Sequence, residues 1–187
     1  MRKPDKHDAE QKKLIVFMDC GDTIIDEGTE IRDEEGTVIS GHVIPGADVA
    51  VKTLAERGYR LAIVADGTAQ SFKNLLTANG LYDCFETLIY SEPIKAVKPS
   101  PRMFKAAIGA MDLTEEDRSR IIMVGNNLSR DVKGANRMGI TSVFLSWTSR
   151  YPKEPADEWE VPNYTIANPL ELIELVESLN ERIADAG

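Results

Sequence analysis

The sequence has few cysteines, few histidines and no long hydrophobic run. Its two cysteines, Cys20 and Cys84, are widely separated among 187 residues, so neither a disulfide framework nor a zinc-binding cysteine cluster is predicted. No apolar run is longer than that at residues 14–18, whereas a signal-peptide core needs about 7–15 apolar residues and a membrane helix about 20. We therefore expect a cytoplasmic protein without a targeting or membrane-spanning segment.

Positive charge is also scarce. Lysine and arginine number 22 against 31 aspartates and glutamates, which gives a net charge of −9. Nucleic acids and anionic membrane surfaces are bound mainly through clustered lysine and arginine side chains, so we expect neither as a partner. A chain of this length buries about 70% of the surface that its unfolded form exposes, which is enough for one domain to fold without disulfides.

What is present is an alternation of short apolar runs with segments of helical periodicity. Nearly continuous apolar runs are typical of strands buried on both faces of a parallel sheet. The alternation predicts an α/β fold, a doubly wound, Rossmann-like three-layer sandwich. Residues 14–187 are expected to form a single domain, preceded by a polar tail at residues 1–13. The runs are residues 14–18, 61–65, 87–90, 121–124 and 141–145, and the helical stripes lie in residues 47–55, 103–111 and 172–183.

Two segments interrupt this alternation. Residues 24–44 replace the helix expected after the first strand and, around a Glu35-Gly36 turn, predict a β-hairpin that we call the flap. Residues 146–163, the aromatic loop, contain tryptophan, tyrosine and several prolines. A long connection in a compact domain is often functional, but packing against the last helix is an equally good interpretation. The aromatic loop is also where we expect the interface of a homo-oligomer.

Polar side chains follow the predicted strands directly. Ligands of open α/β sheets bind beyond the carboxyl ends of the strands, so these side chains should gather at one edge. Any one of them could instead cap a helix, but their recurrence at successive strand ends favours a site. The candidates are Asp19, Cys20, Gly21, Asp22 and Thr23 after the first run, Asp66, Gly67 and Thr68 after the second, Lys98 beyond the third, and Asn126 and Asp131 after the fourth.

Four of these segments resemble, in order and spacing, the motifs of haloacid dehalogenase (HAD) superfamily hydrolases. The resemblance covers roughly residues 13–146 and is closest to the capless, phosphatase-like type, with altered motifs. The matches are Asp19-Cys20-Gly21-Asp22-Thr23 for the family's Asp-x-Asp-x-Thr, Ala65-Asp66-Gly67 for a Thr or Ser that ends the second strand, Lys98 for the family's lysine, and Gly125-Asn126 through Asp131 for Gly-Asp-x-x-x-x-Asp.

The resemblance implies a Mg²⁺-dependent hydrolase that forms an aspartyl-phosphate. Asp19 matches the nucleophile, and Lys98 matches the lysine that neutralises phosphoryl charge. A cation is needed because two anions, the carboxylate and the phosphate, must approach each other. By position, the residues that hold the metal are Asp19, Gly21, Asn126 and Asp131. The residues that bind substrate phosphate are Cys20, Gly21, Thr23, Asp66, Gly67, Thr68 and Lys98.

Three positions depart from the family pattern. Gly21 replaces the aspartate that protonates the leaving group, Ala65 replaces the hydroxyl of the second motif, and Asn126 replaces a carboxylate on the metal side. General acid–base groups contribute roughly 10²–10⁴-fold to rate, so we expect weakened activity. Asp22 is adjacent to Gly21, but its side chain is expected to point elsewhere, and Thr68 is a candidate for the missing hydroxyl.

Three functions fit these residues. The first is a phosphatase for phosphomonoesters or for aryl or acyl phosphates, whose good leaving groups need no acid. The second is a protein that binds phosphate, metal or a partner and has lost catalysis. A haloacid dehalogenase fits less well, because dehalogenases of this family carry a helical cap after the first motif and the flap is too short for one. The site therefore suits a small phosphorylated molecule or a phosphoprotein loop, and the acidic flap would repel nucleic acid.

Overall fold

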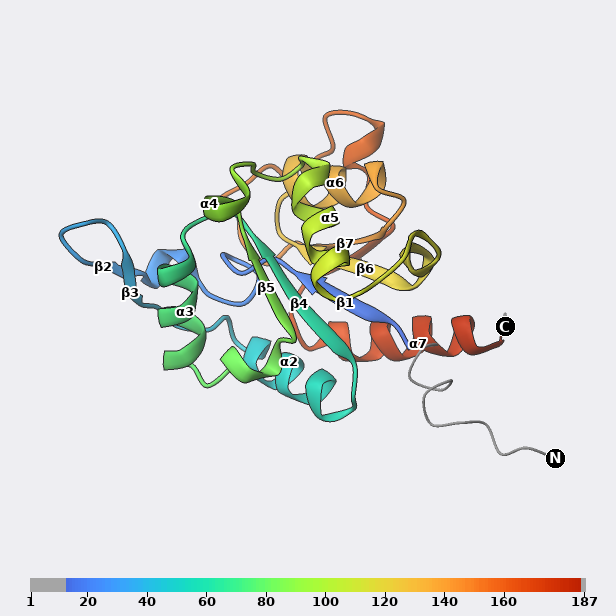
Figure 1. The fold of residues 1–187 in the computed structure, drawn as a ribbon, viewed down its shortest axis with the longest axis horizontal. Coiled ribbons are helices and arrows are strands. Elements are labelled where there is room, and N and C mark those ends of the chain that lie inside the picture. Colours follow the sequence, from blue (N-terminus) through green and yellow to red (C-terminus); the bar gives the residue numbers. More distant parts are fainter. Residues whose placement is uncertain (1–12, 186–187) are drawn as a thin grey trace.

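The computed structural model describes residues 13–185 and has a six-stranded parallel sheet at its centre (Figure 1). The strand order is β5-β4-β1-β6-β7-β8. All five predicted strands are confirmed, and β8 is an addition that its short sequence did not indicate. The predicted tail, residues 1–13, lies outside the described residues except for Lys13. The strands are β1 (Ile15–Met18), β4 (Arg60–Ala65), β5 (Thr87–Tyr90), β6 (Ile121–Gly125), β7 (Thr141–Leu145) and β8 (Tyr164–Ile166), with β2 (Ile31–Arg32) and β3 (Val38–Ser40) as a separate antiparallel pair.

Helices cover both faces of the sheet and complete the predicted three-layer sandwich (Figure 1). One face carries α2 (Ala47–Glu56), α3 (Ala69–Ala78) and α7 (Glu171–Asp185), and the other carries α5 (Pro101–Ala110) and α6 (Lys133–Arg137). The shorter elements are α4 (Ser91–Ile94), the 3-10 turns η1 (Glu27–Thr29), η2 (Tyr82–Cys84), η3 (Glu115–Arg120) and η5 (Glu158–Glu160), and the π-helical turn η4 (Leu128–Val132).

The alternation of side chains along β1 divides the core between the two faces of the sheet. Val16 and Met18 pack into a cluster with α2, α3 and α7, whereas Ile15 and Phe17 pack into a second cluster with α5 and α6. All four are buried, and burial of each such side chain contributes about 1.5–3 kcal/mol. Because both faces are covered, the strand is apolar throughout, as the sequence pattern predicted.

The flap, residues 24–44, forms the predicted hairpin and lies against α3 (Figure 1). Ser71 Oγ accepts a hydrogen bond from the Val38 N–H at 3.0 Å, and Asn74 Nδ2 donates to the Val38 carbonyl at 2.8 Å. In the described chain, no helical cap occurs between β1 and α2. The flap therefore stands at the same edge of the sheet as the predicted site and is fixed there by α3.

The aromatic loop, residues 146–163, is fixed to α6. Asn136 Nδ2 donates to the carbonyls of Trp159 and Val161 at 2.8 and 2.9 Å. Lys133 forms ion pairs with two acidic residues of the loop. These contacts are with α6 and not with the last helix, α7, so packing of the loop against the last helix stays a prediction. The opposite end of the loop takes part in the site described below.

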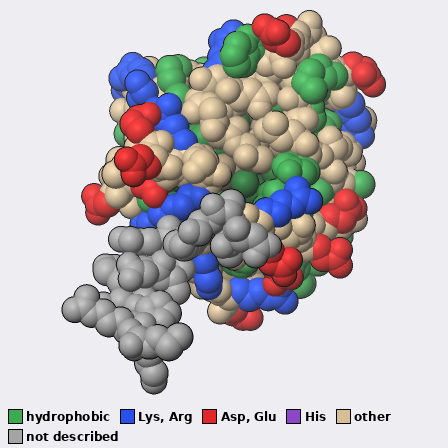
Figure 2. Space-filling model, turned by 90° about the vertical axis from the view of Figure 1, so that its right-hand side faces the viewer, with side chains coloured by type: hydrophobic (Ala, Val, Ile, Leu, Met, Phe, Trp, Pro, Cys, Tyr) green, Lys and Arg blue, Asp and Glu red, His purple; other side chains and the backbone are tan. Residues whose placement is uncertain are grey.

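The surface carries charge of both signs. On the face shown in Figure 2, lysine and arginine side chains are interspersed with aspartate and glutamate around the rim. No helix within residues 13–185 combines the length and the apolar character that crossing a membrane requires.

Candidate active site

The carboxyl ends of β1, β4 and β6 meet at one edge of the sheet because these strands are parallel neighbours. A cavity of about 180 Å³ lies there. Its wall contains one or more residues from the end of each of the three strands, as the sequence predicted. The predicted site residues that line it are Asp19, Gly21, Asp66, Gly67, Thr68 and Asn126.

A buried lysine bridges two carboxylates beside the cavity. Lys98 Nζ lies 2.8 Å from Oδ1 of Asp19 and 2.7 Å from Oδ1 of Asp131, and its side chain is 1% exposed. The Lys98 backbone N–H donates to Asp66 Oδ1 at 2.9 Å. Burial lowers the pKa of Lys98, but Asp131 and Asp19 reverse this effect and hold the pKa above its ordinary value. Burial raises the pKa of Asp131, and the Lys98 ammonium opposes that rise.

The donor set fits a hard divalent cation such as Mg²⁺, whose usual ligands are oxygens. Asp19 and Asp131 supply carboxylates, and the buried Asn126 amide nitrogen has no hydrogen-bond partner among the described residues. An amide can be oriented with either its oxygen or its nitrogen toward a neighbour, so Asn126 can present an oxygen. Within residues 13–185 no trio of Asp, Glu, His or Cys is arranged to hold a metal, so the site offers two carboxylates and one amide. The metal-binding role of Gly21 stays a prediction.

Gly125, the last residue of β6, leaves room for the second carboxylate. Asp131 belongs to η4, and its Oδ2 accepts the Asn127 N–H at 3.0 Å. A Cβ on Gly125 would lie 2.5 Å from the Asp131 Cβ and closer still to the carboxyl group. The absence of a side chain at Gly125 therefore permits the Asp131 carboxylate to reach Lys98.

The segment after β4 is occupied by hydrogen bonds within the protein. The Gly67 N–H, one of the donors we expected to face phosphate, donates to Ser91 Oγ at 2.8 Å. Thr68 Oγ1 lies 2.7 Å from Ser71 Oγ, so its hydroxyl is also paired. Both residues line the cavity, but binding of phosphate through these two groups requires their present partners to be exchanged. Their roles in binding stay predictions.

Three residues of the first motif are buried away from solvent. Cys20 lies in the hydrophobic core, where burial raises the pKa of its thiol well above the usual value. Thr23 is also buried, and its hydroxyl has no hydrogen-bond partner among the described residues. Contact of Cys20 or Thr23 with phosphate therefore depends on their backbone and stays a prediction. Asp22 is fully buried with both carboxylate oxygens held by Arg150, so it does not face the cavity as an acid.

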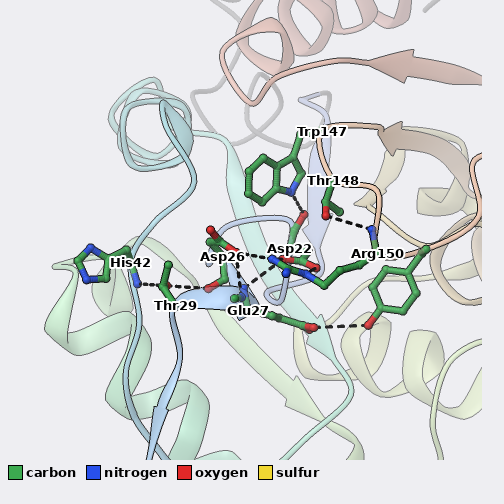
Figure 3. Close-up of polar contacts among 10 residues, drawn as sticks. Asp22, Asp26, Glu27, Thr29, His42, Trp147, Thr148 and Arg150 are labelled. Carbon is green, nitrogen blue, oxygen red and sulfur yellow. Dashed lines mark hydrogen bonds and ion pairs between the residues drawn. The ribbon is translucent and has the colours of Figure 1, made fainter.

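Side chains that the motifs did not indicate complete the cavity wall. Glu27 lies against Gly21, and Tyr151 Oη donates to Glu27 Oε2 at 3.5 Å (Figure 3). Burial raises the pKa of Glu27, and the neighbouring carboxylates raise it further. The sequence signal for these residues was indirect, since they belong to segments that interrupt the strand–helix alternation or lie inside the fourth motif. They are Glu27, Glu30 and Arg32 from the flap, Arg130 from η4 and Tyr151 from the aromatic loop.

Comparison with known proteins identifies the family. The family model described as haloacid dehalogenase-like hydrolase matches residues 21–145, more than half of the chain. This chain belongs to the HAD hydrolase family. The resemblance that the four motifs carry is thereby confirmed, and so is the HAD-like fold.

Relatives of this HAD hydrolase have different activities. A glyceraldehyde 3-phosphate phosphatase from Methanopyrus kandleri is 31% identical over 126 residues, which are 67% of this chain and 53% of that one. A (S)-2-haloacid dehalogenase from Pseudomonas sp. strain YL is 29% identical over 129 residues, 69% of this chain and 53% of that one. The HAD hydrolase described here thus spans about half the length of the curated relatives it matches.

Solved structures share the fold of this HAD hydrolase. An uncharacterized protein from Listeria monocytogenes serotype 4b superposes with a TM-score of 0.73 at 21% identity, over 90% of this chain and 99% of that one. A HAD phosphatase from Thermococcus onnurineus superposes with a TM-score of 0.62 at 27% identity, over 72% of this chain and 58% of that one.

Proposed function

We propose that this HAD hydrolase is a Mg²⁺-dependent phosphatase that hydrolyses small phosphomonoesters, or aryl or acyl phosphates, through an aspartyl-phosphate on Asp19. The observation that carries the proposal is the position of Asp19, whose carboxylate lines the cavity and lies 2.8 Å from the buried Lys98. The phosphatase relative from Methanopyrus kandleri supports a small phosphorylated substrate.

Asp19 and Lys98 perform the chemistry in this proposal. An oxygen of the Asp19 carboxylate attacks phosphorus while the bond to the leaving oxygen breaks, which leaves the phosphoryl group on Asp19. Aspartate is ionised at neutral pH and needs no base for this step. Lys98 balances part of the negative charge, and Mg²⁺, when bound, supplies the positive charge that lets two anions meet. Water then attacks phosphorus, and inorganic phosphate leaves as the Asp19 carboxylate is restored.

The size and lining of the cavity favour a compact substrate. Its volume of about 180 Å³ is below the usual range for drug-sized ligands, roughly 300–1,000 Å³. Arg32 and Arg130 line it and pair with the carboxylates of Glu30 and Asp66, so binding of an anionic substrate through these arginines requires an exchange of partners. A cytoplasmic location is part of the proposal and is supported by the two free cysteines.

The proposal is tested by phosphate release from a panel of phosphate esters at millimolar Mg²⁺, with EDTA as the metal-free control. We expect turnover that requires Mg²⁺ and is abolished in Asp19→Asn. Asp83→Asn is the matched control, because Asp83 is an exposed aspartate of η2, and this variant should retain parental activity. Equal activity of the parent and Asp19→Asn would refute the proposed nucleophile. Binding of Mg²⁺ and phosphate without any turnover would favour the binding-protein alternative.

A dehalogenase is the second candidate, and Gly21 is the observation in its favour. A halide leaves as an anion and takes no proton, so a family member of that kind works without the acid that position 21 lacks. The (S)-2-haloacid dehalogenase relative supports this candidate. Halide release from a 2-haloacid, measured beside the phosphatase panel, separates the two, and we expect the phosphatase reaction to dominate.

A further inference from the structure

We propose that Glu27 of the flap supplies the acid–base carboxyl group that position 21 lacks. This inference rests on the proposed phosphatase function and adds a catalytic residue to it. Sequence spacing gives no reason to connect residues 21 and 27, because they belong to different elements: Gly21 follows β1 and Glu27 begins η1. The connection comes from their positions in space.

The Glu27 carboxyl group occupies the volume that a side chain at position 21 would take. A Cβ built on Gly21 would lie 2.9 Å from the Glu27 carboxyl carbon, and closer still to its Oε1. The first three atoms met by that Cβ all belong to the Glu27 side chain. Asp19, Gly21 and Glu27 line the same cavity. The family's carboxyl group is missing at position 21, and the Glu27 carboxyl group of the flap lies in its place.

The turn that carries Glu27 is fixed by a polar network (Figure 3). The Glu27 N–H donates to Asp22 Oδ1 at 3.1 Å, and Asp26 Oδ1 caps η1 by accepting the Gly28 N–H at 2.9 Å. Arg150 of the aromatic loop forms ion pairs with both Asp22 and Asp26. This network sets the position of the Glu27 backbone, as expected for a turn that must place a reactive group.

The Glu27 carboxyl itself remains turned toward the cavity. Its polar contact is with the hydroxyl of Tyr151, another residue of the cavity wall, at 3.5 Å. Asp22, the nearest carboxylate in sequence to Gly21, instead has both oxygens engaged by Arg150. Of the two, Glu27 alone has the exposure to the cavity that proton transfer needs.

The proposed steps conserve atoms and protons. As Asp19 bonds to phosphorus, the bond from phosphorus to the leaving oxygen breaks and its electron pair stays on that oxygen. The leaving oxygen takes the proton of the Glu27 carboxylic acid and departs as an alcohol. In the second step the Glu27 carboxylate takes a proton from water, whose oxygen bonds to phosphorus as the bond to Asp19 breaks. Inorganic phosphate, the Asp19 carboxylate and protonated Glu27 are regenerated.

The test is the dependence of kcat/KM on the leaving group. Alkyl phosphates need a proton on the leaving oxygen, whereas p-nitrophenyl phosphate has a good leaving group and does not. In Glu27→Gln the ratio of kcat/KM for p-nitrophenyl phosphate to that for an alkyl phosphate should rise by about 10²–10⁴-fold. Glu34→Gln removes the same charge from an exposed position of the flap and should leave the ratio at the parental value. A loss that is equal for both substrates, or no loss, overturns the proposal.

A double variant restores the carboxyl group from the other position. Glu27→Ala empties the space beside Gly21 and leaves room for an aspartate there. The double variant Gly21→Asp/Glu27→Ala should therefore have a kcat/KM for the alkyl phosphate at least tenfold above that of Glu27→Ala, a gain consistent with acid catalysis. Absence of recovery in a folded double variant contradicts the proposal. Two other outcomes concern the phosphatase function itself: it is wrong if the parent hydrolyses no ester, or if Asp19→Asn is as active as the parent. Failure of the Glu27 proposal alone is recognised by an active parent in which Glu27→Gln leaves the ratio of the two kcat/KM values unchanged.

Discussion

Arg150 Nε lies 2.6 Å from Oδ2 of Asp22, and Arg150 Nη2 lies 3.0 Å from its Oδ1. This bidentate pair joins the aromatic loop to the turn after β1, although the two residues are 128 positions apart. Trp147 Nε1 strengthens the same junction by donating to the Asp22 carbonyl at 2.7 Å. Because Asp22 is fully buried, its charge depends on Arg150 for compensation.

Replacement of Arg150 tests that dependence. Arg150→Met leaves a buried carboxylate without its cation and should lower the free energy of unfolding by about 1–3 kcal/mol in urea titrations. The double variant with Asp22→Asn should recover part of this loss, because the buried charge is then removed as well. Arg137→Met is the control, since Arg137 is exposed on α6, and should change stability by no more than about 0.5 kcal/mol. An equal effect of the two arginine substitutions would contradict this interpretation.

Gly125 gives a second prediction, on packing against the Asp131 carboxylate. Gly125→Ala places a Cβ against Asp131, so it should cost about 1–3 kcal/mol and weaken Mg²⁺ binding by displacing the carboxylate. Gly109→Ala is the matched control: Gly109 lies within α5, and a Cβ there meets no neighbouring atom of the described chain within 4 Å. That control should stabilise the protein by about 0.5–1 kcal/mol. Urea titration and calorimetric Mg²⁺ titration measure the two effects.

Asn126 gives a third prediction, on metal affinity. Asn126→Asp adds a carboxylate where the structure has an amide, so Mg²⁺ should bind on the order of tenfold more tightly. Without metal the same variant should melt at a lower temperature, because the new charge joins Asp19 and Asp131 in a buried site. Asn180→Asp is the control, since Asn180 lies on α7 away from the cavity and an aspartate can likewise accept the hydrogen bond that the Leu14 N–H donates to its Oδ1. Relative to the parent, the melting temperature of Asn126→Asp should be raised with Mg²⁺ and lowered with EDTA. Changes of the same size in the control would contradict the metal-binding role of Asn126.

The two cysteines give a fourth prediction, on pH. Burial raises the pKa of Cys20 well above its ordinary value, and burial also raises the pKa of the half-exposed Cys84 to a lesser degree. The thiolate is the reactive form, so a raised pKa means less thiolate at a given pH and alkylation that accelerates as the pH rises. Iodoacetamide should therefore modify Cys84 first in the native protein, and Cys20 only after unfolding. Mass spectrometry of peptides across a pH series decides this, and early labelling of Cys20 would contradict its burial.

The sequence predicted the sheet well because of how its strands are buried. Every residue of β1 is covered on one face or the other, which produces an unbroken apolar run and a clear signal. β8 was not predicted, because it has three residues and its central Thr165 is exposed. The helices α2, α5 and α7 each bury one stripe, and helical spacing indicated all three.

The residues of the candidate site also differ in how well the sequence predicts them. Asp19, Lys98 and Asp131 follow strands at positions that a motif can match, and the structure places them in contact. Glu27 has no such marker, because its approach to Gly21 depends on a 3-10 turn and on an arginine from the far end of the chain. Contacts that arise from packing between distant loops leave no periodic trace in the sequence, so only the three-dimensional arrangement indicates them.

The attachment of the flap has a consequence for how a substrate enters. Val38 is buried, and its backbone groups bond to Ser71 and Asn74, while Asn79 Nδ2 donates to the Gly41 carbonyl. Three hydrogen bonds, at roughly 0.5–1.5 kcal/mol each, hold the hairpin to α3 and to Asn79 at the end of that helix, so lifting the hairpin costs free energy. The flap is thus attached as part of the cavity wall. If the proposed phosphatase function holds, a substrate has to fit the cavity beside Asp19 with the flap attached, so the shape of the cavity selects among phosphate esters more than movement of the flap does.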